Sequence, residues 1–197
     1  MTRATSERAY GPAVGEPPVL VDPRRWGGVL GLVGGLVFVL TSSAAFGAGV
    51  QVPALVAGAG LALAALFGHY GRPVALGPAV RPDRRALALY GACVVGELAL
   101  IVLGTAVLLG AGRTDLRPAL IAAVVGLHFL PMARAFGERM FLLLGGLVSV
   151  AGATGLVAGA AGVPRAGDGA ALAAGLVLLG VVTAYAWGWF APAGPRP

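Results

Sequence analysis

The sequence predicts an all-α fold: a polytopic membrane bundle of six transmembrane helices with both termini in the cytoplasm. The 197 residues are 58% hydrophobic and only 11% charged, and the mean hydropathy is +0.88. Soluble domains are about 45–50% apolar and about 25% charged, so a soluble chain of this composition would expose large apolar patches. Disordered chains are poor in hydrophobic residues, which excludes that class as well.

Six apolar runs, separated by polar segments, predict the individual helices. Each run is close to the length of about 20 residues with which a helix crosses about 30 Å of hydrocarbon. Open strands would leave backbone groups unpaired in lipid, and a barrel would show an apolar–polar alternation that these runs lack. The runs cover residues 26–48, 52–69, 86–110, 118–136, 140–163 and 170–190.

The first two runs are bounded by recognisable signals. Residues 1–25 are polar and rich in proline, so we expect a flexible cytoplasmic tail. The first run then begins at Trp26, behind two arginines, and carries no charge. A cleaved signal peptide is the competing interpretation, but the long segment of mixed charge before the run disfavours it. The second run has Pro53 in its first turn, where proline is tolerated.

Few polar residues interrupt the four later runs. Glu97 is the single acidic residue deep within the third run, and the fourth contains His128 and Pro131. A short turn at residues 137–139 precedes the fifth run. Residues 191–197 form a short tail after the sixth run, which ends in three aromatic residues, Trp187, Trp189 and Phe190.

Arginine is distributed unevenly between the two sides that six crossings define. With a cytoplasmic N-terminus, 11 of the 14 basic residues, all of them arginine, face inside and three face outside. Positive residues favour the cytoplasmic side, so both termini are predicted in the cytoplasm of a plasma-membrane protein. Anionic lipid head groups attract arginine-rich loops such as residues 72–85. We expect head-group contacts from Arg81, Arg84 and Arg85, and charge that serves orientation alone is the alternative.

Two ionisable residues are expected to meet halfway across the membrane. Glu97 lies about 11 residues, roughly 16 Å, from the cytoplasmic start of the third helix, and His128 lies about 10 residues, roughly 15 Å, from the outer start of the fourth. These helices are consecutive and antiparallel, so both side chains reach one depth and we expect a contact. Pairing lowers the cost of burying either group.

Neighbouring residues add detail to this candidate site. Pro131 removes one helical hydrogen bond and should kink the fourth helix beside His128. Tyr90 and Cys93 lie on the face of the third helix that carries Glu97. Intramembrane ionisable residues are functional by default hypothesis, which indicates a proton relay or ligand site here. A structural clamp between the two helices is the alternative.

The rest of the sequence excludes several kinds of site. No basic module of the kind that binds nucleic acid occurs, despite a net charge of +6. Cys93 is the only cysteine, and we find no metal-ligand spacing or cofactor motif, so neither a metal nor a cofactor is predicted. We expect water to solvate His69, the other histidine, at the inner end of the second run. The 33 glycines predict closely packed helices and allow oligomers through glycine-rich faces.

The leading interpretation is a multi-pass membrane protein with a non-enzymatic role, whose partner is the lipid bilayer. The first alternative is a proton-coupled transporter or channel that uses Glu97 and His128, although broken helices in matching halves are not evident. The second is an intramembrane enzyme that uses the same pair as acid and base, although no second polar cluster accompanies it.

The segment GLHFLPMARAFG, residues 126–137, resembles one found in a family of small uncharacterised bacterial integral membrane proteins. The resemblance covers this segment and the six-helix size. It implies that His128, Phe129 and Pro131 belong to the characteristic helix of that family, and it implies no activity.

Overall fold

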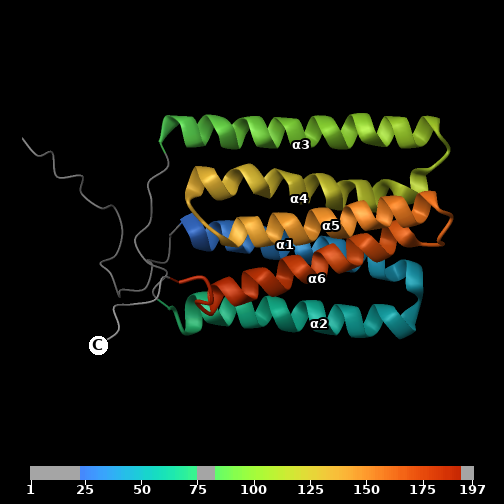
Figure 1. The fold of residues 1–197 in the computed structure, drawn as a ribbon. Helices are drawn as coiled ribbons and strands as arrows, with labels where there is room; N and C mark the ends of the chain where they lie inside the picture. The colour runs from blue at the N-terminus through green and yellow to red at the C-terminus, as the bar shows by residue number, and fades with distance from the viewer. Residues whose placement is uncertain (1–22, 75–82, 192–197) are drawn as a thin grey trace, which may run out of the picture.

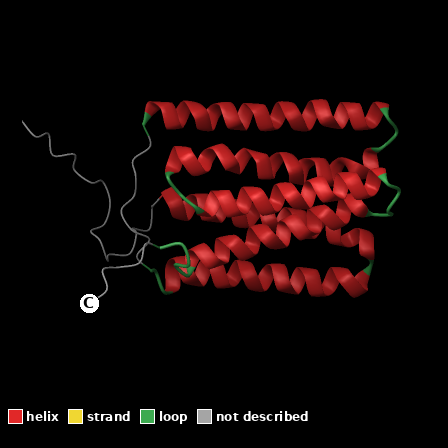
Figure 2. Ribbon diagram, viewed as in Figure 1, coloured by secondary structure: helices red, strands yellow, loops and turns green. Residues whose placement is uncertain are grey.

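The six apolar runs of the sequence form six long α-helices. A computed structural model describes residues 23–74 and 83–191, and this part of the chain is helical and contains no strand (Figure 2). Each of the six helices is long and apolar enough to cross a membrane, which confirms the predicted fold class at that level. The helices are α1 (Pro23–Ser43), α2 (Ala48–Leu66), α3 (Arg84–Gly110), α4 (Arg117–Phe136), α5 (Met140–Ala160) and α6 (Ala166–Ala186).

Three short helical turns extend these elements. The turns η1 (Ala44–Phe46) and η3 (Thr114–Leu116) are 3₁₀-helical and lie before α2 and α4. The third, η2 (Phe67–Gly71), is a π-helical turn that continues α2. π-helical turns are rare in proteins, but those that occur often lie at functional sites. The end of α2 is therefore a place to look for unusual side-chain packing.

Helices that follow one another in the sequence run in opposite directions, and α3 lies at one edge of the bundle (Figure 1). The central helix α6 packs against α1, α2, α4 and α5, and 11 of its 21 residues are buried. In contrast, α3 packs mainly on α4, and Ala86 is its single fully buried residue. The bundle therefore consists of a group of helices around α6 and one peripheral helix.

Small residues allow the central helices to approach closely. A Cβ atom added to Gly175 of α6 would lie 2.7 Å from Cβ of Phe38 and 2.8 Å from the carbonyl oxygen of Gly35, both on α1. On α5, a Cβ atom at Gly152 would overlap the backbone of Ala123 on α4. The predicted glycine-rich faces are thus used within this chain, where they bring backbones together.

Large apolar side chains point outward as well as inward. Leucine and valine side chains are more than half exposed along the outer faces of several helices, as for Leu63, Val107 and Val157. Exposing these side chains to water would be unfavourable, whereas exposing them to lipid tails, which are as apolar as leucine, is not. The surface is therefore of the kind that a bilayer covers.

Several helices begin or end at different residues from those predicted, and α1 ends at Ser43 rather than at residue 48. α2 begins at Ala48, because Gly47 with φ 75° turns the chain there, and Pro53 therefore lies inside the helix rather than in its first turn. α6 runs from Ala166 to Ala186, so Trp187 follows the helix instead of ending it. The indole Nε1 of Trp187 donates to the carbonyl oxygen of Ala64 on α2 at 3.1 Å. This bond joins the ends of α2 and α6.

Candidate functional site

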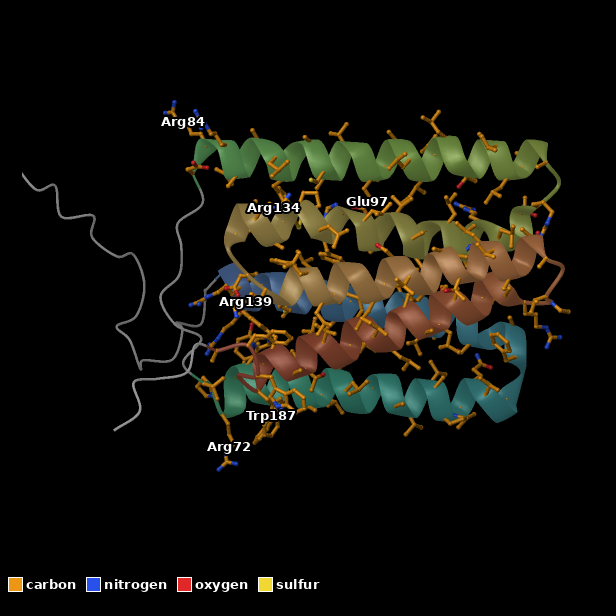
Figure 3. All side chains as sticks on the ribbon, viewed as in Figure 1. Arg72, Arg84, Glu97, Arg134, Arg139 and Trp187 are labelled. Atoms are coloured by element: carbon orange, nitrogen blue, oxygen red, sulfur yellow. The ribbon has the colours of Figure 1, made fainter. Side chains whose placement is uncertain are left out.

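The structure brings Glu97 of α3 into contact with His128 of α4, about halfway along the bundle (Figure 3). Oε2 of Glu97 lies 2.8 Å from Nδ1 of His128, which confirms the contact expected from their equal depth. The two side chains are 21% and 11% exposed, so neighbouring helices enclose most of each. Nδ1 makes no hydrogen bond of suitable direction, so the contact is a close acid–base pair without ideal alignment.

Aromatic rings support His128 on the side away from α3. The ring of Phe129 meets His128 edge-on, with centroids 5.4 Å apart, and Phe129 stacks on Phe141 of α5 at 5.8 Å. Pro131 lies three residues beyond His128, and α4 continues through it as one helix. The imidazole is therefore backed by apolar rings and meets the carboxylate on the side of α3. A bend of α4 at Pro131 stays a prediction.

Tyr90 and Cys93 are the other two residues of the weakly polar stripe predicted on α3. Tyr90 packs edge-on against Phe136 of α4, with ring centroids 6.3 Å apart. Cys93 carries a free, half-buried thiol between Tyr90 and Glu97 along the helix. We call this line of contacts the α3–α4 seam; it consists of Tyr90, Cys93, Glu97, His128 and Phe136.

The chemistry available at the seam is that of one acid and one base. At 2.8 Å, Glu97 and His128 can share or exchange one proton, and their attraction joins two helices. Among the residues that the structure describes, no three His, Cys, Asp or Glu side chains gather as a metal site would require. A role for the pair in transport or in acid–base catalysis stays a prediction.

His69 is buried, contrary to the expectation that water solvates it. Its side chain is 2% exposed within the π-helical turn η2. Its ring meets those of Tyr70 and Tyr185 edge-on, with centroids 6.3 Å apart in each case. The expectation was wrong because α2 continues by one π-helical turn and packs beneath the end of α6, while Gly28 of α1 leaves room for the imidazole.

A second group of polar residues surrounds His69, at the end of the bundle where arginines gather. The hydroxyl of Tyr185 donates to Oε1 of Glu138 at 3.3 Å. The guanidinium of Arg25 is 2% exposed and lies 5.2 Å from the centre of the Tyr70 ring. We call this group the arginine-end cluster; it consists of Arg25, His69, Tyr70, Glu138 and Tyr185.

The sequence interpretation did not find the arginine-end cluster. Its members come from α1, η2, the turn between α4 and α5, and α6, so no local motif contains them. The signal that could have revealed it is the segment FGHYG, in which a histidine and two aromatic residues lie close to two glycines. Small neighbours leave space for large side chains to become buried.

The predicted head-group residues lie at the start of α3. The carboxylate of Asp83 accepts a hydrogen bond from the backbone N–H of Ala86 at 2.7 Å and caps the helix. Arg84 and Arg85 follow in the first turn and are exposed, and Arg84 projects from the end of the bundle (Figure 3). Arg81 lies outside the described residues. Contact between these arginines and lipid stays a prediction.

No protein-family model, curated protein or solved structure matches the chain. The resemblance of residues 126–137 to a bacterial membrane-protein family therefore stays a prediction. The functional argument rests on the geometry of the two groups described above.

Proposed function

We propose that the chain is a multi-pass protein of the plasma membrane, which it crosses six times with both termini in the cytoplasm. The alternating helices place the starts of α1, α3 and α5 at one end of the bundle (Figure 1). Seven of the ten arginines in the described residues lie at that end, and three lie at the other, Arg113, Arg117 and Arg165. This excess of positive charge supports a cytoplasmic position for the arginine-rich end.

The role that the geometry supports best is non-enzymatic, with Glu97 and His128 as a structural clamp. The observation that carries this proposal is the position of the pair, which joins the peripheral helix α3 to α4 about halfway along two largely apolar helices. A charged side chain left alone at such a depth costs about 2.5–3.5 kcal/mol on insertion scales. Separating the two helices at this point is therefore unfavourable.

A proton-flux measurement tests the clamp against transport. The purified chain is reconstituted into liposomes that contain the pH-sensitive dye pyranine, and a pH step is applied outside. The clamp predicts that liposomes with the wild-type chain, with the Glu97→Gln variant and without protein all equilibrate at the same rate. Faster equilibration that requires the protein and disappears in Glu97→Gln would contradict the clamp.

Proton-coupled transport is the second candidate. The observation that favours it is an acid and a base 2.8 Å apart at half the length of the helices, an arrangement in which a proton in transit can rest. Under this candidate, both Glu97→Gln and His128→Gln abolish the protein-dependent flux, while circular dichroism shows unchanged helix content. Flux that persists in both variants would exclude the pair from the transport path.

A further inference from the structure

Arg25 is a buried cation without a counterion in the described residues. Its side chain is 2% exposed, and its Nε atom is buried with no hydrogen-bond partner. Within the described residues, its guanidinium carbon lies 5.2 Å from the centre of the Tyr70 ring. A buried charge of this kind calls for an anion.

The contact with Tyr70 covers the guanidinium and leaves Nε without a hydrogen-bond partner. An aromatic face attracts a cation through its quadrupole, but it supplies no acceptor for the N–H groups. Tyr70 itself is 41% exposed, whereas Arg25 is 2% exposed. The ring of Tyr70 also meets the buried ring of His69 edge-on, with centroids 6.3 Å apart. The guanidinium of Arg25 is thus buried beside one partly exposed aromatic side chain.

At this end of the bundle, arginines outnumber the carboxylates of Asp83 and Glu138, which favours a negatively charged ligand. Arg72 and Arg139 project from the same end of the bundle (Figure 3), and both are exposed. They raise the local concentration of anions. The planar fork of N–H donors on arginine fits the oxygen atoms of phosphate, which it can bind through two parallel hydrogen bonds.

We propose that Arg25 binds the phosphate group of a ligand at the arginine-rich end, with Tyr70 as the side chain that covers the empty site. Two sources can supply this group: the head group of a membrane phospholipid, which lies at this level if the chain is inserted as proposed, and free phosphate from solution. The lipid source rests on the proposed membrane insertion. Binding of inorganic phosphate does not, so the two proposals can fail separately.

Thermal unfolding of the full chain in detergent tests this site. The melting temperature is measured with sodium phosphate against sodium chloride at equal ionic strength, and with dioleoyl phosphatidate against dioleoyl phosphatidylcholine in mixed micelles. Each variant is compared with its own ligand-free protein, so a general loss of stability does not enter the comparison. We expect phosphatidate, phosphate or both to raise the melting temperature of the wild-type chain.

Substitutions connect the effect to Arg25. Arg25→Gln should weaken phosphate binding about tenfold, because it removes charge-assisted hydrogen bonds. Arg134→Gln is the matched control, since it removes an exposed arginine in the last turn of α4, at the same end, and should leave the response unchanged. If Arg25→Gln does not yield folded protein, Arg25→Lys takes its place. It keeps the charge, loses the fork of donors and should still weaken the response.

The results separate the two sources and can overturn the proposal. A response to phosphatidate without one to inorganic phosphate identifies a lipid head group, and equal responses identify the phosphate group alone. No response in the wild-type chain to either probe would overturn the site. Equal responses in the wild type and in both Arg25 variants would overturn it as well, because the binding would then lie elsewhere.

Discussion

Oε2 of Glu97 on α3 lies 2.8 Å from Nδ1 of His128 on α4, and this pair joins the peripheral helix of the bundle to the rest. The two residues are 31 positions apart in the sequence, but the tight connection between two antiparallel helices brings them to one level. The arrangement has a mechanical consequence. Loss of the pair should loosen α3 before it affects the helices packed around α6.

A double-mutant cycle measures the coupling between the two residues. We expect the combined change Glu97→Leu and His128→Leu to cost less free energy of unfolding than the sum of the two single changes. Removing one partner leaves the other unpaired in an apolar seam, whereas removing both leaves none. Polar contacts in membranes average about 0.6 kcal/mol and reach about 1.7 kcal/mol, which sets the expected coupling. Unfolding in mixed micelles of increasing denaturing detergent provides the free energies.

A control cycle shows whether the coupling is specific. The control combines Glu97→Leu on α3 with Thr183→Ala on α6. The hydroxyl of Thr183 donates to the carbonyl oxygens of Leu61 and Leu179 rather than to Glu97. These two changes should be additive, since distant sites without shared partners usually are. Strict additivity in the cycle of Glu97 and His128 would contradict the clamp.

Cysteine labelling measures the predicted topology. On a Cys93→Ala background, Asp115→Cys should react with a membrane-impermeant maleimide from outside intact cells, because it lies in the turn η3 at the arginine-poor end. Arg84→Cys at the arginine-rich end is the matched position and should react only after the membrane is permeabilised. Both positions are exposed in the structure. The reverse pattern of labelling would show that the termini are outside.

The sequence was sufficient to predict the number of helices and the contact at the α3–α4 seam. Long apolar runs can satisfy their backbone in lipid only as helices, and depth along a helix follows from residue number at 1.5 Å per residue. Glu97 and His128 could therefore be placed at one level before their orientation was known. Their rotation toward each other was left open by this reasoning, and the geometry of the seam supplies it.

The sequence was not sufficient to predict which helices are central and which residues are buried at the bundle ends. All six runs are strongly apolar, so hydropathy does not distinguish α6 from α3. Which helix lies at the centre depends on side-chain size, because small residues such as Ala174 and Gly175 let other backbones approach α6. His69 was misplaced for a related reason: its burial depends on Gly28 and on the end of α6, which are distant in sequence.

A glycine substitution on α6 tests the close contact with α1. Gly175→Ala would place Cβ 2.7 Å from Cβ of Phe38 and 2.8 Å from the backbone oxygen of Gly35, so the helices must separate. We expect a loss of about 1–3 kcal/mol in the free energy of unfolding, as for other overpacked sites. Gly180→Ala is the control on the same helix, because an added Cβ there meets no atom within 4 Å. Equal effects of the two substitutions would contradict the packing of α1 on α6.

The last prediction concerns the space that Gly28 leaves for His69. Gly28→Ala would place Cβ 2.7 Å from Nε2 of His69, and the imidazole is too deeply buried to move away freely. We expect a loss of about 1–3 kcal/mol in the free energy of unfolding. Gly27→Ala, one position earlier on α1, meets no atom within 4 Å and should be neutral or slightly stabilising, because alanine favours a helix over glycine by about 0.5–1 kcal/mol.

A second substitution assigns this cost to the imidazole itself. In the His69→Ala background, Gly28→Ala no longer meets a ring, so its cost should fall to that of Gly27→Ala. Coupling of this kind is expected only if α1 and the π-helical turn of α2 are in contact at these two residues. If Gly28→Ala were equally destabilising with and without the imidazole, the strain would arise elsewhere on α1, and the buried position of His69 at the arginine-rich end would be contradicted.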